Sequence, residues 1–206
     1  MGTVTAPTRS RLPPEARRSQ LLDLGVRLLA TRSLDELSVD LLAEEAGISR
    51  GLLYHYFGNK HDFREAVVRR AADDLIAQTA PPPGGDPLER LHASLAAYVD
   101  YVLANFEGYV SLLKGSAGGS EAVRAIYEEV RGVLSERIFT EDPDGEFIAD
   151  TPHNRLVVRG WSALTEELVI TWGTDRRAGR ATVTREELLE VITGALPALV
   201  RPPSAG

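Results

Sequence analysis

Apolar residues recur at helical spacing along almost the whole chain, and alternating β-branched runs bounded by turns are nearly absent. Amphipathic helices repeat about every 3.6 residues, whereas strands repeat about every two. The pattern therefore predicts an all-α fold with no internal repeat and about nine helices. They are expected near residues 14–31, 39–46, 50–56, 60–78, 87–105, 106–114, 119–139, 153–173 and 184–200. The prolines and glycines of residues 81–85 form the clearest internal break.

The chain also divides by charge. Residues 1–70 carry 11 Lys and Arg against 9 Asp and Glu, whereas residues 71–206 carry 12 against 21. A first third that is neutral to basic, followed by an acidic remainder, suggests two roles in one chain. Residues 1–13 hold prolines and arginines among small polar residues, and we expect them to form a flexible arm.

Composition excludes several classes of protein. The 206 residues include no cysteine, which rules out disulfides, thiolate nucleophiles and cysteine-ligated metal sites. No apolar run approaches the roughly 18 residues that span a bilayer, and no signal-peptide core is visible. We therefore expect a cytoplasmic protein with no membrane partner. Paired carboxylates, nucleophile–base pairs and metal-ligand spacings are not visible either, so we expect neither an enzyme nor a bound cofactor or metal.

Two short predicted helices joined by a tight turn form a helix-turn-helix at residues 38–57. Ser38 is placed to cap the first helix, Gly47 to end it, and Ser49 to cap the second. Asn59 follows as a cap for the next, longer helix.

The second helix of this pair has an unusual outward face. At about 100° per residue, Leu53 and Phe57 point inward, while Gly51, Leu52 and His55 lie on the opposite arc. A solvent-facing helix normally carries charge there. A DNA major groove accepts such a face, because glycine permits close approach, leucine can touch a thymine methyl and histidine can bond a base edge or phosphate.

Aromatic residues flank this face. Tyr54 and Tyr56 lie on its two sides, where their hydroxyls can reach phosphates. The alternative is an aromatic plug inside a helical bundle, which is what we expect of Phe57. Lys60 begins the next helix, where a cation is disfavoured unless an anion lies nearby, so a phosphate contact is expected there.

Residues 39–60 combine more than a dozen spaced identities with these caps and turns. They read Val39-x-x-Leu42-Ala43-x-x-Ala46-Gly47-Ile48-Ser49-Arg50-Gly51-x-Leu53-Tyr54-x-Tyr56-Phe57-x-Asn59-Lys60. The pattern resembles the DNA-binding signature of the TetR family of bacterial transcriptional repressors, over about residues 17–65. The resemblance implies an obligate homodimer that places two recognition helices in successive major grooves of a palindromic operator in double-stranded DNA. It also implies an effector that tilts the fourth helix.

Roles for individual residues follow from the resemblance. It implies phosphate contacts for Tyr54 and Lys60, and backbone anchors at Arg17 or Arg18. The groove-facing set that it implies is Arg50, Gly51, Leu52, His55 and Tyr56. Two positions depart from the family pattern: Leu52 replaces a small hydroxylated residue, and Asp40 stands where a basic or polar residue is common.

We expect residues 14–60 to form the DNA-binding domain and residues 61–206 a ligand-binding and dimerisation domain. Aromatic residues in the second domain are typical either of ordinary core or of a pocket for a small, largely apolar effector. The candidate pocket residues are Tyr98, Tyr101, Phe106, Tyr109, Tyr127 and Trp161. His92, Arg124 and His153 are candidate polar anchors, and residues 115–119 are expected to form a flexible corner.

The last two predicted helices carry apolar faces suited to a partner. Two such helices from each subunit would form a four-helix bundle. The candidate interface residues are Leu156, Gly160, Ala163, Glu167, Leu188, Val191, Ile192, Ala195 and Leu199.

These observations favour a dimeric, ligand-responsive repressor. An activator, or a regulator that needs no ligand, is the alternative that keeps DNA binding. A small-molecule carrier or an enzyme with an incidental helix-turn-helix is the alternative from another class, and no constellation of catalytic residues supports it.

Overall fold

The computed structural model describes residues 13–118 and 120–200, and this part of the chain forms nine helices and no strand. The helices are α1 (Pro14–Leu28), α2 (Val39–Ala46), α3 (Arg50–Phe57), α4 (Lys60–Gln78), α5 (Pro87–Ala104), α6 (Phe106–Gly118), α7 (Glu121–Thr140), α8 (Pro152–Arg177) and α9 (Arg185–Leu199). The predicted all-α class is confirmed. The expected flexible arm, apart from Pro13, lies outside the described residues.

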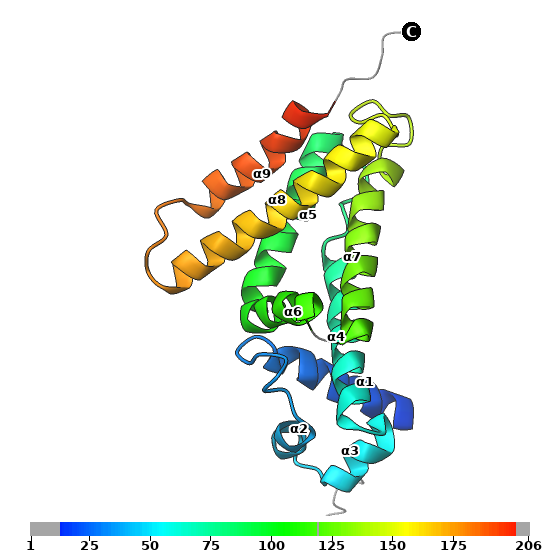
Figure 1. The fold of residues 1–206 in the computed structure, drawn as a ribbon. Coiled ribbons are helices and arrows are strands. Elements are labelled where there is room, and N and C mark those ends of the chain that lie inside the picture. Colours follow the sequence, from blue (N-terminus) through cyan, green and yellow to red (C-terminus); the bar gives the residue numbers. More distant parts are fainter. Residues whose placement is uncertain (1–12, 119, 201–206) are drawn as a thin grey trace, which may run out of the picture.

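The helices are arranged along an elongated molecule (Figure 1). Helices α1, α2 and α3 gather at one end, and α8 and α9 pack side by side toward the other. Helix α4 leaves the small end and runs along α7, so it belongs to both parts. The helix that directly follows α3 therefore reaches into the body of the protein.

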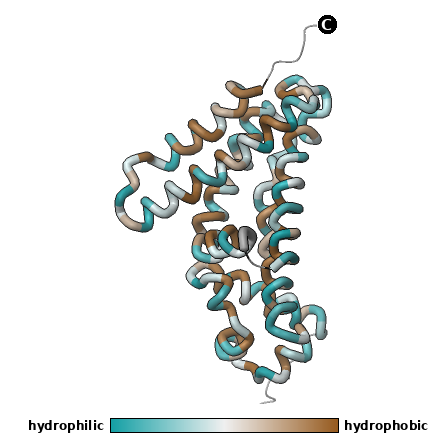
Figure 2. Tube along the Cα trace, viewed as in Figure 1, coloured by the Kyte–Doolittle hydropathy of each residue, from teal (hydrophilic) through white to brown (hydrophobic). Residues whose placement is uncertain are grey.

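Two clusters of buried apolar residues hold these helices together. The first cluster contains residues of α1, α2, α3 and α4, and it continues into α7 through Val123, Ile126 and Val130. The second joins α5, α7, α8 and α9 around Val158, Trp161 and other apolar side chains. Hydrophobic and hydrophilic residues alternate along each helix (Figure 2), as expected for helices that bury one face.

Two helices are longer than predicted. Helix α6 continues to Gly118 and α8 continues to Arg177, so the prediction of a flexible corner at residues 115–119 is wrong up to Gly118. Both errors come from treating glycine as a stop. A glycine inside a helix costs about 1 kcal/mol relative to alanine, which packing elsewhere on the helix can offset.

Gly173 in α8 has a packing role. A Cβ added to it would lie 2.5 Å from Cε2 of Phe106, so glycine lets the phenylalanine ring lie directly against the α8 backbone. The Arg177 guanidinium lies 4.6 Å from the centre of the same ring. Phe106 is thus a core residue at the α6–α8 contact.

A close contact joins α6 to the end of α1. The Gly108 amide donates to the Leu29 carbonyl at 2.9 Å, and a Cβ on Gly108 would lie 2.5 Å from the Cβ of Leu29. Nearby, the Leu34 amide donates to Ser111 Oγ at 2.9 Å. The small end of the molecule is therefore fixed to the body by backbone contact that excludes any side chain at Gly108.

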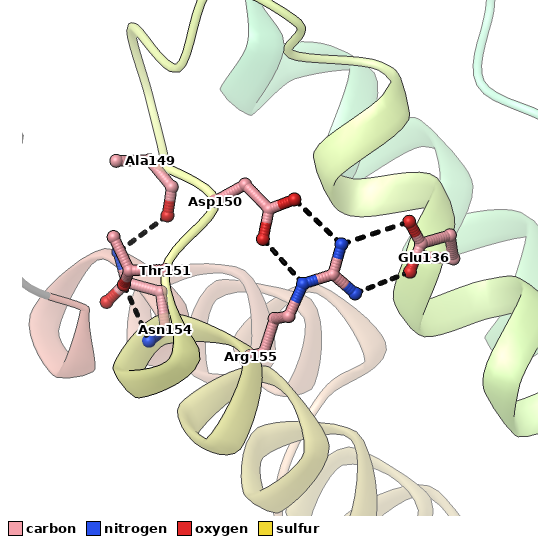
Figure 3. Close-up of polar contacts among 6 residues, drawn as sticks. All are labelled: Glu136, Ala149, Asp150, Thr151, Asn154 and Arg155. Carbon is pink, nitrogen blue, oxygen red and sulfur yellow. Dashed lines mark hydrogen bonds and ion pairs between the residues drawn. The ribbon is translucent and has the colours of Figure 1, made fainter.

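Arg155 fixes the start of α8 (Figure 3). Its Nε donates to Asp150 Oδ1 at 2.5 Å and its Nη1 donates to Glu136 Oε2 on α7 at 2.7 Å. These bonds lower the pKa of both carboxyls. Asn154 adds a bond from Nδ2 to the Ala149 carbonyl at 3.0 Å. Together they orient α8 against α7 and the loop that precedes it.

Within the described residues, no helix combines the length and apolar character needed to cross a membrane.

Candidate nucleic-acid interface and internal cavity

The helix-turn-helix forms where local signals predicted it. Ser38 Oγ accepts from the Leu41 amide at 3.1 Å, and Ser49 Oγ accepts from the Leu52 amide at 3.3 Å. Gly47 ends α2 with φ +62°, in the left-handed region that favours glycine. These caps satisfy backbone groups at the helix ends and fix the angle between α2 and α3.

Helix α3 is anchored by two buried side chains. Leu53 and Phe57 are almost fully buried, and the Phe57 ring lies 5.2 Å from the Phe63 ring. The Arg18 guanidinium lies 5.3 Å from the Phe57 ring centre, on the same cluster. Arg18 therefore packs on the α3 anchor, and Arg17 donates to Gln20 Oε1 at 3.2 Å.

The opposite face of α3 is open. Leu52 is 37% exposed and Tyr54 is 47% exposed, which is high for large apolar or aromatic side chains. Gly51 and His55 are also exposed, and no atom lies within 4 Å of a Cβ built on Gly51. Tyr56 is half-buried, with its ring 5.7 Å from that of His55. The protein itself gives no packing reason for glycine at position 51.

An ion pair lies at the edge of this face. Arg50 Nε lies 2.5 Å from Asp40 Oδ1, and both side chains are more than half exposed. Asp40 thus holds the guanidinium of a residue predicted to face the groove. Sequence reasoning noted Asp40 as unusual without finding its partner.

Lys60 stands at the start of α4 and is exposed. Asn59 Oδ1 accepts from the amides of His61 at 2.8 Å and Asp62 at 3.0 Å, which caps the helix as predicted. Lys60 has no ion-pair partner among the described residues, so its ammonium is available to an external anion.

A central cavity of about 190 Å³ lies between α4, α5, α6, α7 and α8 and touches both core clusters. Its wall is mostly apolar, and five of the six predicted pocket residues border it. They are Tyr98, Tyr101, Tyr109, Tyr127 and Trp161. Phe106 does not, because its ring packs on Gly173; that prediction is wrong. Helix α4 contributes Val68, Ala71, Ala72 and Leu75 to the wall, and its C-cap residue Thr79 borders the cavity as well.

The proposed polar anchors lie elsewhere. His92 Nδ1 is 3.3 Å from Thr193 Oγ1, between α5 and α9. Arg124 is exposed and pairs with Glu121 at 4.0 Å, and His153 is exposed. None of the three borders the central cavity.

The polar groups that do border the cavity centre on Glu166. Its Oε1 accepts from Tyr127 Oη at 2.7 Å, and its Oε2 accepts from Tyr109 Oη at 3.0 Å. Tyr98 Oη lies 2.9 Å from Tyr109 Oη. Burial raises the pKa of Tyr127 to about 12, and burial raises those of Tyr98 and Tyr109 as well.

Sequence reasoning missed Glu166. It named the adjacent Glu167, which is exposed and accepts from Thr171 Oγ1 at 3.1 Å. The available signal was the spacing from Trp161: Thr165 lies four residues on, and both side chains are buried. Glu166 itself lies four residues after Ser162, which also borders the cavity.

The predicted interface residues divide into two groups. Leu156, Val191 and Leu199 are 71%, 56% and 51% exposed. Gly160, Ala163 and Glu167 are exposed and Ala195 is half-buried. Leu188 and Ile192 are 5% and 1% exposed, because their face of α9 packs into the second core cluster of the same chain. Placing these two on an outward face was wrong.

Among the residues that the structure describes, no three His, Asp or Glu side chains gather in a way that could hold a metal ion.

Two family profiles match this chain. One, described as bacterial regulatory proteins of the tetR family, matches residues 21–67, and another, described as a tetracyclin repressor-like C-terminal domain, matches residues 87–194. A crystal structure of a tetR-family transcriptional regulator from Streptomyces coelicolor is 33% identical, with a TM-score of 0.79 over 91% of this chain and 82% of that one.

Curated relatives match over a shorter length. The HTH-type transcriptional activator FasR of Mycolicibacterium smegmatis is 31% identical over 102 residues, 48% of this chain and 47% of FasR. The HTH-type transcriptional regulator BetI of Vibrio parahaemolyticus is 31% identical over 96 residues, 47% of each chain. This chain thus spans about half the length of the curated relatives that it matches. With an N-terminal and a C-terminal profile matched on one all-α architecture, the chain belongs to the TetR family of helix-turn-helix transcriptional regulators.

Proposed function

We propose that this regulator is a ligand-responsive repressor that binds palindromic operator DNA as a homodimer in the cytoplasm. Residues 14–60 act as the DNA-binding domain and residues 61–206 as the ligand-binding and dimerisation domain. The observation that carries DNA binding is the outward face of α3. Leu52, Tyr54 and His55 stand exposed there around a glycine that needs no close packing within the chain.

The DNA contacts proposed for this face fall into two kinds. Tyr54 and Lys60 bond phosphates, with Arg17 or Arg18 as further backbone anchors. The groove-facing set is Arg50, Gly51, Leu52, His55 and Tyr56. Phosphate contacts position the protein on any duplex, and base contacts select the sequence.

Dimerisation is proposed through the outward face of α8 and α9. That face carries Leu156, Leu164 and Val191, each more than 40% exposed, beside the small residues Gly160 and Ala163. Large apolar side chains exposed on two neighbouring helices suggest a surface that another protein covers. A second copy of the same face would cover it and complete a four-helix bundle.

Ligand response is proposed through α4. Only two residues separate this helix from α3, and its second half lines the cavity. The position of α4 sets the distance between the two recognition helices of the dimer. A ligand that binds one position of α4 more tightly than another shifts the equilibrium toward that position by the difference between the two affinities. Two recognition helices must stand about 34 Å apart to enter successive major grooves, so a small shift lowers operator affinity.

Selection of bound DNA from random fragments tests the proposal. We expect a two-fold symmetric motif, affinity that falls steeply with salt, and a dimer by sedimentation at working concentration. A bound motif without symmetry, or a monomer that binds as tightly, would refute the dimeric arrangement. A reporter gene under the selected operator distinguishes repression from activation. An activator, which the relative FasR is named, raises transcription when present, whereas a repressor lowers it.

A further inference from the structure

The hydrogen-bonded groups in the cavity wall form a directed chain. Tyr109 and Tyr127 each donate to a different oxygen of Glu166. Because Tyr109 has already given its proton, the 2.9 Å contact with Tyr98 requires Tyr98 to be the donor. Each of the three hydroxyls has therefore used its single proton inside the wall.

This direction decides what the wall offers to a ligand. With their protons committed, Tyr98, Tyr127 and Glu166 present only lone pairs. All three hydroxyls are protonated at neutral pH, and the two bonds that Glu166 accepts set the direction of the chain. The group that completes this part of the cavity must donate hydrogen bonds.

The charge of Glu166 has no close basic partner. Among the described residues no arginine, lysine or histidine nitrogen forms an ion pair with it. Arg131 is nearby, but its Nη1 donates to Tyr127 Oη at 3.3 Å and its guanidinium lies 5.6 Å from the centre of the Tyr127 ring. Arg131 borders both the cavity and a second hollow. Arg90 and Arg137 also border the cavity, but Arg90 pairs with Glu141, and Arg137 Nη2 donates to the Ile76 carbonyl at 2.9 Å.

A second polar atom of the wall stands without a partner. Thr165 borders the cavity, is 4% exposed, and its Oγ1 has no hydrogen-bond partner. A threonine inside a helix commonly bonds the carbonyl four residues back, as Thr174 does with Ile170 at 2.8 Å. An unmade bond at a buried hydroxyl costs free energy, which a ligand's polar group would recover.

We propose that the central cavity binds a protonated amine with an apolar body. The ammonium donates to Glu166 and to the lone pairs of Tyr98 or Tyr127, and the apolar body lies against the aliphatic residues of α4 and α5. Thr165 supplies a further polar contact. This inference rests on the proposed ligand response and names the chemical class of its effector.

An anionic ligand is the competing possibility. A carboxylate could accept from the remaining N–H groups of Arg131, but it would stand beside the Glu166 carboxylate, where like charges repel. A neutral alcohol could donate a single bond but would leave the charge of Glu166 unbalanced. The order of affinity expected is therefore amine above alcohol above carboxylate.

Four probes of one chain length test this order. n-Octylamine, octyltrimethylammonium, 1-octanol and octanoate are titrated at neutral pH into the full-length protein by calorimetry, below their aggregation concentrations. We expect octylamine to bind at least about tenfold tighter than octanol, the difference typical of a charge-assisted hydrogen bond. Octyltrimethylammonium carries the charge without a donor, so it should bind more weakly than octylamine.

Glu166→Gln keeps the size of the side chain and removes its charge. It should erase the advantage of octylamine over octanol. Glu121→Gln is the matched control, because Glu121 is 91% exposed at the start of α7 and loses the same charge away from the cavity. Tyr98→Phe removes the terminal lone pair and should give a smaller loss. It also provides the test if Glu166→Gln fails to fold by circular dichroism.

Three results would overturn the inference: octanoate binding most tightly, no binding of octylamine, or equal octylamine affinity in wild type, Glu166→Gln and Tyr98→Phe. Operator affinity measured in the same samples separates this inference from the proposed function. If octylamine binds through Glu166 and leaves operator affinity unchanged, the cavity chemistry stands and ligand response to this class is refuted.

Discussion

Gly51 offers a way to separate folding from DNA binding with one methyl group. It lies in the first turn of α3, and a Cβ added there meets no atom within 4 Å. Replacing glycine by alanine in a helix stabilises it by about 0.5–1 kcal/mol, since alanine loses less backbone entropy on folding. For a chain of this size that raises Tm by about 1–4 °C.

Binding should change in the opposite direction. If the α3 backbone approaches the groove floor at Gly51, the methyl of Gly51→Ala is forced into a packed contact, which typically costs about 1–3 kcal/mol. Because the proposed dimer places two such helices on the operator, the cost is counted twice and operator affinity should fall by about 30-fold or more. Thermal unfolding and fluorescence anisotropy on a labelled operator measure the two effects on the same preparation.

Gly132→Ala serves as the control. Gly132 is an exposed glycine inside α7 whose added Cβ also meets nothing within 4 Å. It should raise Tm similarly and leave operator affinity unchanged. A Gly51→Ala protein that is more stable and binds the operator as tightly as wild type would refute the close approach of α3.

Other substitutions test separate steps of the reasoning. Tyr54→Phe should weaken binding to all sequences by a similar factor, whereas His55→Ala should change sequence preference in a selection experiment; the reverse pattern would mean that their roles are exchanged. Asp40→Asn should raise affinity for nonspecific DNA, because it frees an arginine and removes a negative charge; the dependence of affinity on salt should steepen by about one phosphate contact per subunit. An unchanged salt slope in anisotropy titrations would exclude that role. Gly173→Ala should lower the free energy of unfolding by about 1–3 kcal/mol in urea, since its methyl would overlap a buried ring; a neutral result would contradict the tight α6–α8 contact. Stability should also fall as pH rises from about 10 toward 12, because Tyr127 stays protonated in the folded state while an unfolded tyrosine ionises; a flat pH profile of Tm over that range would argue against its burial.

The local parts of the fold could be predicted from sequence because their causes are local. Ser38, Ser49 and Asn59 cap helices through bonds to amides two or three residues away. Gly47 ends α2 through its own backbone conformation. The exposed face of α3 was predictable as well, since a short helix with two inward anchors leaves little choice for the rest.

The errors involve contacts between distant segments. Helix α9 carries two apolar stripes, and periodicity alone does not say which one packs inside its own chain. Leu188 and Ile192 proved to be internal, while Val191 and Leu199 face outward. Phe106 was grouped with the cavity because it is aromatic, but it packs on a glycine 67 residues further along the chain. Which face of a helix is buried depends on which other helices pack against it, and the periodicity of a single helix does not contain that information.

The contact between Gly108 and Leu29 has a consequence for how such a regulator diversifies. The joint leaves no room for even one methyl, so this position tolerates little variation. Leu29 and Gly108 also border the cavity, so this contact forms one part of its wall and other side chains form the rest. New chemical preferences can therefore arise in descendants of this protein by exchange of those other side chains, while the connection to α1 is inherited unchanged.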